Sequence, residues 1–384
     1  MKIGVITFWN GNSNYGQILQ CWALQQYLKE LGHKPYVIRF IPSNYISPFK
    51  AFLKRVLLVE KIKLFREYLF NNKAYRLRMQ NLRNDKKRDF DSFRASNLQM
   101  SERVYKNLSE IQSNPPIADA YIVGSDQVWA QILSSRNSRA FFLDFGLPKT
   151  KRISYAPSFV VKEYPKEYQK ELKDLLQRFN AVSCREYTGV EICKSMGIDA
   201  TKVIDPTLLL NKGKYLELIG NPITKKEQVF IYSLNISSSD QIYWNELKEY
   251  ASNYGLSVKV TPSQGYFSAD ELFGDEVEYL YATPKEWLQT IAESRLVVTP
   301  SFHGVVLSII LETPFVFVPL DGQFASGNSR ITDLLKDLKL EDRVLSDLGY
   351  RDVCSHDINW KDVGEKLNIA KKDSLDYLIK ALGQ

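Results

Sequence analysis

The sequence predicts an α/β protein with two domains, each built around a parallel sheet. Short apolar runs recur along the chain, and stretches with helical periodicity separate them. This alternation is typical of βαβ units, in which a helix carries the chain from one strand to the next parallel strand. A chain of 384 residues also exceeds the usual size of a single hydrophobic core, so we expect two domains.

Ten apolar runs are predicted strands, because each is short and bounded by polar or turn-forming residues. They are Ile3–Phe8, Tyr36–Phe40, Ala120–Val123, Arg152–Tyr155, Ala181–Cys184, Lys202–Ile204, Val229–Leu234, Ser257–Thr261, Leu296–Thr299 and Phe315–Val318. We expect an N-terminal domain over residues 1–200 and a C-terminal domain over 201–357. The last helix, within 358–384, is expected to pack back on the first domain.

The first helix is predicted over Tyr15–Leu31, directly after the first strand. Its apolar residues recur at helical spacing, and Gly32 is a typical stop signal just beyond its C-terminus. The residues expected on its buried face are Ile18, Leu19, Trp22, Ala23, Tyr27, Leu28 and Leu31.

Residues 46–112 interrupt the alternation and are predicted to form a basic helical insertion in the first domain. Between Lys50 and Arg94 there are fourteen Lys and Arg residues against five Asp and Glu, whereas the whole chain carries a net charge of +7. Two interpretations stay open: the apolar residues pack on the first domain, or they face an anionic membrane surface. Nucleic acid is not expected as a partner, because no recognition motif accompanies the charge.

Cysteine usage and hydropathy favour a cytoplasmic protein without a metal. The four cysteines form no CxxC pair and have no histidine at zinc spacing. The apolar run at the N-terminus is too short for a signal peptide, and no window approaches 18 uninterrupted apolar residues. If the basic segment binds lipid, the protein would be peripheral at the inner face of the membrane.

His303 is one of only three histidines and lies where a strand gives way to a helix. The strand Leu296–Thr299 ends before Pro300, and an apolar helical pattern begins at Val305. Ligands of open α/β sheets bind at the carboxyl ends of the strands, and histidine ionises near neutral pH. The structural alternative, in which His303 only packs at the start of the helix, stays open.

Three other polar positions are placed in the same way. Asp126 follows the strand Ala120–Val123 and could cap a helix, accept a proton or bind sugar hydroxyls. Arg185 follows Ala181–Cys184, and Arg330 ends a glycine-containing loop; a guanidinium suits a carboxylate or phosphate, although either could be an ordinary surface residue. The loop from Gly11 to Gly16, which includes Asn14, could hold an anion or simply cap the first helix.

Six short motifs occur in a fixed order along the chain. They are Asn14-Tyr-Gly-Gln17, Gly124-Ser-Asp-Gln-Val-Trp129, Tyr155-Ala-Pro-Ser158, Ser183-Cys-Arg-Glu186, Asp205-Pro206 and Ser301-Phe-His-Gly304. As an ordered set they resemble the polysaccharide pyruvyl transferase family. The resemblance extends from about Lys2 to Arg343, and the basic segment is the part that matches poorly.

The resemblance implies a GT-B-like fold and transfer of a pyruvyl group from phosphoenolpyruvate to two sugar hydroxyls as a ketal. It implies His303 and Asp126 as catalytic residues, and Arg185 as a donor-binding residue. Many members carry an arginine where this chain has Ser301, so this chain must use another cation, for which Arg330 and Arg295 are the candidates, or another donor. Asn14, Gly16 and Ser301 are expected beside the donor, which is a substrate; we expect no cofactor.

Two other functions remain open on the sequence. A glycosyltransferase that uses a nucleotide sugar could have the same fold, since a fold alone does not fix an activity. A non-catalytic protein of glycan assembly is the other, because Ser301 departs from the family pattern. The expected acceptor is a sugar or lipid-linked oligosaccharide of cell-surface polysaccharide biosynthesis.

Overall fold

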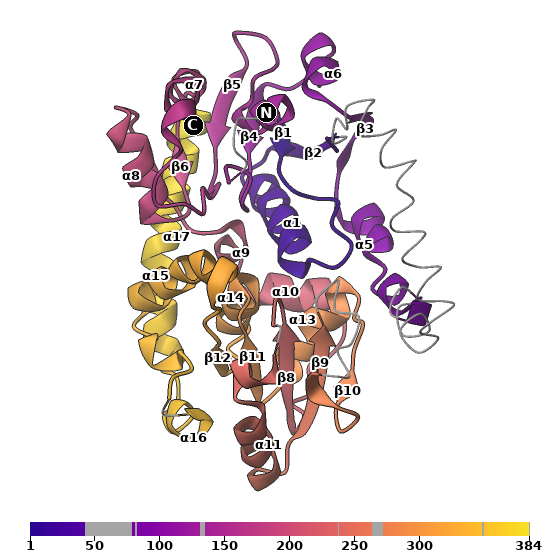
Figure 1. The fold of residues 1–384 in the computed structure, drawn as a ribbon. Coiled ribbons are helices and arrows are strands. Elements are labelled where there is room, and N and C mark those ends of the chain that lie inside the picture. The colour runs from indigo at the N-terminus through magenta and orange to yellow at the C-terminus, as the bar shows by residue number, and fades with distance from the viewer. Residues whose placement is uncertain are drawn as a thin grey trace, which may run out of the picture.

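Two five-stranded parallel sheets form the framework of the chain (Figure 1). The computed structural model describes residues 1–42, 79–80, 83–130, 135–236, 238–262, 272–347 and 349–383. The strand order is β3-β2-β1-β4-β5 in the first sheet and β10-β9-β8-β11-β12 in the second. The two orders are equivalent. In each sheet the first strand lies in the centre, the next two strands extend from it to one edge, and the last two extend from it to the other edge. This is the doubly wound arrangement of a Rossmann-like domain.

Each of the ten predicted strands overlaps an observed one. The strands near the first sheet are β1 (Lys2–Ile6), β2 (Lys34–Phe40), β3 (Met100–Tyr105), β4 (Ala120–Val123), β5 (Lys151–Ser154), β6 (Ser183–Cys184) and β7 (Thr201–Lys202). Those of the second sheet are β8 (Gln228–Ser233), β9 (Ser257–Pro262), β10 (Glu278–Tyr279), β11 (Leu296–Thr299) and β12 (Phe315–Phe317). β6 and β7 pair with each other in a small separate sheet.

The predicted helical insertion 46–112 extends too far toward the C-terminus. Met100–Tyr105 lies inside that range but forms β3, which pairs with β2 at the edge of the first sheet. The sequence did not predict this strand, because Ser101, Glu102 and Arg103 interrupt any alternation of apolar residues. An edge strand exposed to solvent does not need that alternation. Most of the basic segment lies outside the described residues, and so does the predicted lipid-facing surface.

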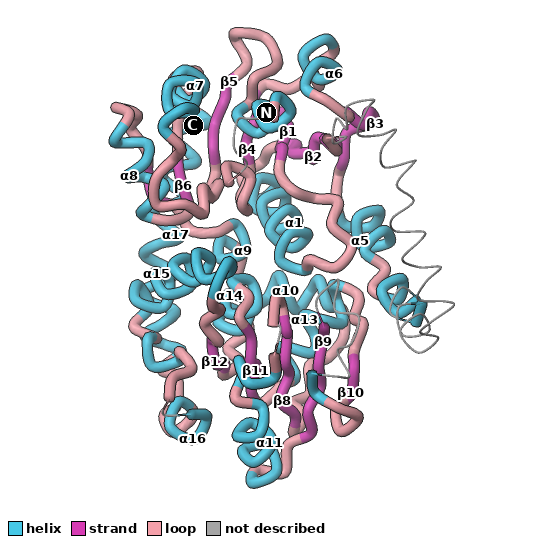
Figure 2. Tube along the Cα trace, in the orientation of Figure 1, coloured by secondary structure: helices cyan, strands magenta, loops and turns pink. Residues whose placement is uncertain are grey.

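Helices cover both sheets (Figure 2). They are α1 (Tyr15–Glu30), α5 (Phe90–Asn97), α6 (Leu108–Ser113), α7 (Lys166–Leu176), α8 (Tyr187–Ser195), α9 (Pro206–Leu209), α10 (Lys212–Ile219), α11 (Trp244–Asn253), α13 (Pro284–Glu293), α14 (Phe302–Ile310), α15 (Asn328–Leu338), α16 (Gly349–Val353) and α17 (Trp360–Leu382), with 3₁₀ turns η1 (Arg136–Phe142), η2 (Ser239–Ile242), η3 (Gly322–Gly327) and η4 (Glu341–Arg343). Among the described residues, none of these helices is both long and apolar enough to span a membrane.

Helix α1 lies at the joint between the domains and is therefore buried on more than one face. Its first residue, Tyr15, stacks on Trp287 of α13 with ring centroids 4.9 Å apart, and its hydroxyl donates to the Ala282 carbonyl at 2.7 Å. The fully buried Arg88 donates to that same hydroxyl at 2.8 Å and to the Pro262 carbonyl of the second domain at 2.6 Å. Tyr15 and Arg88 thus tie the domains together.

Helix α17 runs along both domains (Figure 1). Its Ser374 hydroxyl accepts from the Ile204 amide at 3.1 Å, and its Tyr377 hydroxyl donates to the Ser154 carbonyl at 2.8 Å. Val363 and Leu367, nearer its N-terminus, are buried in the core shared with the second domain. The C-terminal helix therefore packs on the first domain while it emerges from the second.

Candidate active site

The carboxyl ends of the two sheets face each other across a cleft of about 320 Å³. Loops that follow β1, β4 and β5 line it from the first domain, and loops that follow β8, β11 and β12 line it from the second. Its lining residues are Asn14, Asp126, Gln127, Val160, Leu234, Asn235, Pro300, Ser301, Phe302, His303, Leu320, Phe324, Gly327, Asn328, Arg330 and Ile331. This is the position in which open α/β sheets bind ligands.

His303 lies in the first turn of α14, and its ring packs against α1 of the other domain. A Cβ added at Gly16 would lie 2.0 Å from His303 Nδ1, so only glycine leaves room for the ring. Ser301 is the N-cap of α14 and its hydroxyl accepts from the Gly304 amide at 3.3 Å. Ser301 therefore fixes the start of the helix that carries His303, in addition to lining the cleft.

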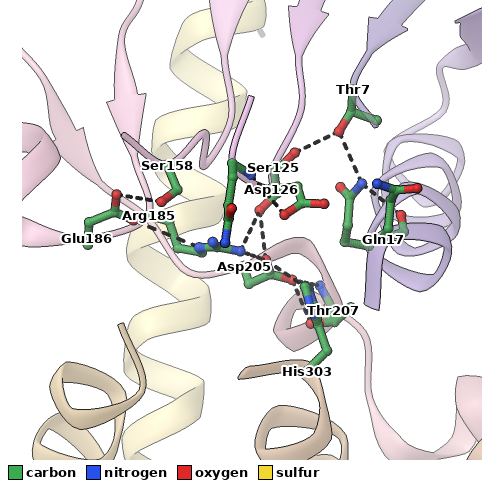
Figure 3. A network of polar contacts seen from close by, with 12 residues as sticks. Thr7, Gln17, Ser125, Asp126, Ser158, Arg185, Glu186, Asp205, Thr207 and His303 are labelled. Atoms are coloured by element: carbon green, nitrogen blue, oxygen red, sulfur yellow. Dashed lines mark hydrogen bonds and ion pairs between the residues drawn. The ribbon is translucent and has the colours of Figure 1, made fainter. Parts of the chain in front are cut away.

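Asp205 lies behind His303 at the centre of a buried polar network (Figure 3). Its Oδ2 accepts from Ser125 Oγ at 2.7 Å and lies 3.6 Å from His303 Nε2, while its Oδ1 accepts from the Thr207 hydroxyl at 2.6 Å. Burial on its own would raise the pKa of Asp205, but His303, Arg185 and the hydrogen bond from Thr207 outweigh it. They hold that pKa well below its ordinary value.

Arg185 is the second cation of this network and is only 6% exposed. Its Nη1 donates to Asp205 Oδ2 at 3.0 Å, and its guanidinium lies 4.6 Å from the centre of the Phe302 ring. Arg185 does not itself line the cleft, whereas Phe302, which its guanidinium contacts, does. Its Nε and Nη2 have no hydrogen-bond partner in the described part of the chain.

Arg330 is the cation that lines the cleft, and it comes from α15 of the second domain. When the Gln127 amide is oriented with its oxygen toward this side chain, Gln127 accepts from both terminal nitrogens at 3.0 and 3.1 Å. Burial, followed by the positive charge of Arg185, lowers the pKa of Arg330 to about 10. The guanidinium thus remains charged at neutral pH, and the contact with Gln127 bridges the two domains.

The two sequence-predicted residues of the first domain face the cleft with constrained geometry. Asp126 adopts a left-handed backbone, with φ of 82°, and its carboxylate accepts from the Gln127 amide at 2.8 Å. Asn14 is the N-cap of α1 and accepts from the Gln17 amide at 3.0 Å. A left-handed conformation is rare for residues other than glycine, and such strain is concentrated at functional sites.

Glu186 supports the cleft from behind. Its Oε1 accepts from the Ser158 hydroxyl at 2.7 Å and from the Phe159 amide at 3.0 Å. These bonds hold the loop that presents Val160 to the cleft, where Val160 also has a positive φ, of 61°. Glu186 thus positions a loop and does not itself line the cleft.

Unpartnered polar atoms gather at this place. Among the described residues, buried atoms without a hydrogen-bond partner include Nε and Nη2 of Arg185, Nε of Arg330 and Nε2 of His303. Two of these atoms have ion-pair partners at longer range: His303 Nε2 lies 3.6 Å from Asp205 Oδ2, and Arg185 Nε lies 3.9 Å from Glu186 Oε2. Because buried polar groups are nearly always paired, Arg185 Nη2 and Arg330 Nε suit a bound ligand or water. Because all three side chains can carry a positive charge, an anion is the ligand that they suit. No cluster of metal-ligating side chains occurs in the described ranges.

The sequence did not reveal several members of the site. Asp205 was recognised only as part of Asp205-Pro206, which is also what an ordinary helix N-cap followed by proline looks like. Ser125 and Gln127 lie in the motif at residues 124–129 but had no predicted role, and Thr207 carried no signal that separates it from other polar loop residues. Arg295, the other cation considered, pairs with Glu227 at 2.6 Å on the exposed surface, at the amino end of β11 and away from the cleft.

A family profile identifies the chain. The profile of polysaccharide pyruvyl transferase matches residues 14–322, which include every residue of the network around Asp205. The chain therefore belongs to the polysaccharide pyruvyl transferase family and is a transferase. No curated protein matches the sequence.

Solved structures match most of the chain at low sequence identity. The S. aureus MnaA–UDP complex has a TM-score of 0.51 and 9% identity, and the match covers 100% of this chain and 97% of that one. The Rickettsia bellii UDP-N-acetylglucosamine 2-epimerase has a TM-score of 0.48, 10% identity and coverage of 99% and 96%. The E. coli heptosyltransferase WaaC with ADP has a TM-score of 0.41, 12% identity and coverage of 88% and 98%. The fold is GT-B-like, with two Rossmann-like domains, as the resemblance implied.

Proposed function

We propose that the protein transfers a pyruvyl group from phosphoenolpyruvate to two hydroxyls of a sugar, as a step of cell-surface polysaccharide biosynthesis. The observation that carries the proposal is that Arg330 and His303 line one cleft while Arg185 lies against Phe302 of its lining. Each of the three has a buried nitrogen that makes no hydrogen bond within the described residues. Phosphoenolpyruvate carries a phosphate and a carboxylate, and two guanidinium groups with a histidine complement such a ligand.

Arg330 takes the place of the arginine that is missing at Ser301. It projects into the cleft from α15, and its charge interacts with Arg185, so the two guanidinium groups are near one another. Two neighbouring cations repel each other unless an anion lies between them. A bound phosphate or carboxylate would remove that repulsion and give the unpartnered nitrogens acceptors.

His303 and Asp126 supply the proton transfers. His303 protonates the methylene carbon of phosphoenolpyruvate, and the first sugar hydroxyl adds to C2 as Asp126 accepts its proton. The C2–O bond to phosphate then breaks, and phosphate leaves with the electron pair. The second hydroxyl attacks C2 and loses its proton to the departing phosphate. The products are a ketal, whose carbon carries the methyl and the carboxylate, and inorganic phosphate. Such acid–base help contributes about 10²–10⁴-fold.

The proposal is tested by incubating the protein with phosphoenolpyruvate and candidate nucleotide-linked or lipid-linked sugars. Mass spectrometry should show an acceptor that gains one pyruvate less water, together with stoichiometric phosphate release. Phosphate release without that product, or no consumption of phosphoenolpyruvate with any acceptor, would contradict it.

A glycosyltransferase with a nucleotide-sugar donor is the alternative that the GT-B-like fold accommodates. The two functions differ in the donor that stabilises the protein. A ligand that binds the folded state raises the melting temperature through linkage. We expect phosphoenolpyruvate alone to raise the melting temperature, whereas a glycosyltransferase would be stabilised by a nucleotide sugar and not by phosphoenolpyruvate.

Attachment to an anionic membrane remains a proposal that rests on the charge of residues 50–94. Vesicles of phosphatidylglycerol should co-sediment with the protein at low salt and release it as the salt concentration rises. If, at low salt, the protein co-sediments with phosphatidylglycerol vesicles no better than with neutral phosphatidylcholine vesicles, the proposal is wrong.

A further inference from the structure

The cleft has a part that the proposed donor and the catalytic residues leave unused. Among the described residues that line it, only Asp126, His303 and Arg330 have ionisable side chains, and the proposed reaction uses all three. The other described lining residues are neutral, and they combine carboxamides with apolar side chains. A second substrate that enters the cleft beside the donor would therefore meet an uncharged surface.

Phe324 is the prominent apolar group of this surface. It lies on η3, between β12 and α15, and remains 41% exposed although it lines a cleft. The loop that carries it is fixed, because the Asn328 carboxamide accepts from the Leu320 amide at 3.0 Å and donates to the Leu320 carbonyl at 2.8 Å. An exposed aromatic ring on a fixed loop is suited to stack against the apolar face of a ligand.

Two carboxamides flank the cleft on the same lining surface. Asn235 follows β8 in a left-handed conformation, with φ of 59°, and no hydrogen bond within the described ranges engages its side chain. Asn14, which the sequence predicted beside the donor, lies on the first domain. Within the described residues its side chain is engaged only through its oxygen, which accepts from the Gln17 amide. Each thus offers donors to a ligand hydroxyl, and Asn235 also offers an acceptor.

We propose that Phe324, Asn235 and Asn14 form an acceptor subsite for a neutral sugar ring, whose apolar face lies on Phe324 and whose hydroxyls bond to the two carboxamides. Aromatic stacking together with a few carboxamide hydrogen bonds recognises such a ring without any charge. A uronic acid ring is disfavoured, because its carboxylate would have no cation beyond the donor-binding residues. The role of the bound sugar as the acceptor rests on the proposed function, whereas the binding of the sugar does not.

The test measures sugar binding without turnover. Saturation-transfer NMR on the full-length protein, with the neutral methyl glycosides of glucose, galactose and mannose, should show transfer to ring protons of one face for at least one sugar. The Phe324→Leu variant should weaken that binding about fivefold, the factor that corresponds to an aromatic stacking contact of about 1 kcal/mol. Phe324→Tyr should retain it, because the aromatic face remains.

Two controls make the outcome specific. Tyr254→Leu removes an aromatic ring that is 62% exposed at the end of α11, outside the cleft, and should leave sugar binding unchanged. With inorganic phosphate present to occupy the donor-binding cations, methyl glucuronide should bind more weakly than methyl glucoside. The proposal is overturned if no neutral glycoside binds, if Phe324→Leu binds as well as the wild type, or if the glucuronide binds equally well. Sugar binding without any reaction of phosphoenolpyruvate would instead reject the proposed function and leave the subsite in place.

Discussion

Gly16 and His303 lie in contact across the domain boundary, and no side chain fits between them. A Cβ at Gly16 would lie 2.0 Å from Nδ1, 2.3 Å from Cγ and 2.7 Å from Cβ of the histidine. The contact places α1 of the first domain directly against the ring that we assign to proton transfer. The orientation of His303 therefore depends on how the two domains are joined as well as on its own helix.

Gly16→Ala should lower turnover strongly, because the new methyl group must displace the His303 ring or separate the domains. A displacement of about 1 Å at a reacting group can cost about 10²-fold, whereas overpacking costs about 1–3 kcal/mol of stability. Steady-state kinetics and thermal unfolding measure the two effects. The matched control is Gly364→Ala, in α17, where an added Cβ meets no neighbour. Wild-type turnover in Gly16→Ala would show that the contact does not constrain the histidine.

His303→Ala should reduce turnover by at least about 10², the lower end for a lost general acid or base. The fold should survive, because the removed ring borders the cleft and Ser301 still caps α14. Circular dichroism and phosphate release measure fold and activity separately. If the variant turns over at the wild-type rate, or does not fold, the assignment of His303 to proton transfer is wrong.

Arg330→Lys should weaken the binding of phosphoenolpyruvate about tenfold, which corresponds to about 1.4 kcal/mol, because an ammonium cannot reproduce the planar fork. Arg185→Lys should also weaken it and should destabilise the fold as well, since Arg185 is paired with the buried Asp205. Isothermal titration and thermal unfolding distinguish the two effects. Arg295→Lys, at an exposed ion pair away from the cleft, is the control and should change neither. Unchanged affinity in both test variants would remove the arginines from the donor site.

The sequence could predict the framework because local patterns determine it. β1, β4, β8 and β11 are apolar runs buried between helices, so their composition alone distinguishes them from loops. β3 could not be predicted, since an edge strand with exposed polar residues resembles any polar segment. The position of His303 at the transition from β11 to α14 followed from the same local patterns.

The arrangement of the site could not be predicted, because it depends on packing between distant segments. Arg330 and Gln127 come from different domains and meet only when the second domain folds back over the first. Asp205 resembles an N-cap residue, which it is; its ion pair with Arg185 depends on the path of the chain between β6 and α9. Ser301 likewise looks like a substitution at a family position, while the structure gives it a capping role.

Asp205→Asn should destabilise the protein by about 3–5 kcal/mol at neutral pH, because Arg185 would be left as a buried charge without its partner. The pKa of Asp205 is lowered in the folded protein, so its contribution is fully present above the unfolded value of about 3.9 and is lost as the pH falls below it. The difference in unfolding free energy between wild type and variant should therefore shrink as the pH falls from 5 toward 3. Urea unfolding across that range measures it.

The control for this series is Glu217→Gln, on the exposed surface of α10, which should alter stability little at any pH. If Asp205→Asn gives a difference that stays constant down to pH 3, Asp205 does not titrate with folding. The contribution of the ion pair with Arg185 to the free energy of unfolding would then not depend on pH in this range.

Tyr15 and Arg88 should act as one unit that holds the domains together. The Tyr15 hydroxyl accepts from Arg88 at 2.8 Å and donates to Ala282, while Arg88 also lies over the Tyr281 ring at 5.0 Å. Tyr15→Phe and Arg88→Met should each destabilise the protein by about 1–3 kcal/mol, the cost of leaving buried polar groups unpaired. The double variant should lose less than the sum, because the shared bond is removed only once.

Chemical unfolding of the four proteins in this cycle measures the coupling, with Arg103→Met as the control for loss of an arginine at an exposed site beside Tyr105. Turnover gives an independent measure. Tyr15 is flanked by Asn14, which lines the cleft, and by Gly16, which contacts His303. Weakening the Tyr15–Arg88 contact between the domains should therefore lower the turnover rate even under conditions in which every variant is fully folded. Additive destabilisation together with wild-type turnover would mean that Arg88 and Tyr15 stabilise the joint separately and do not position the site.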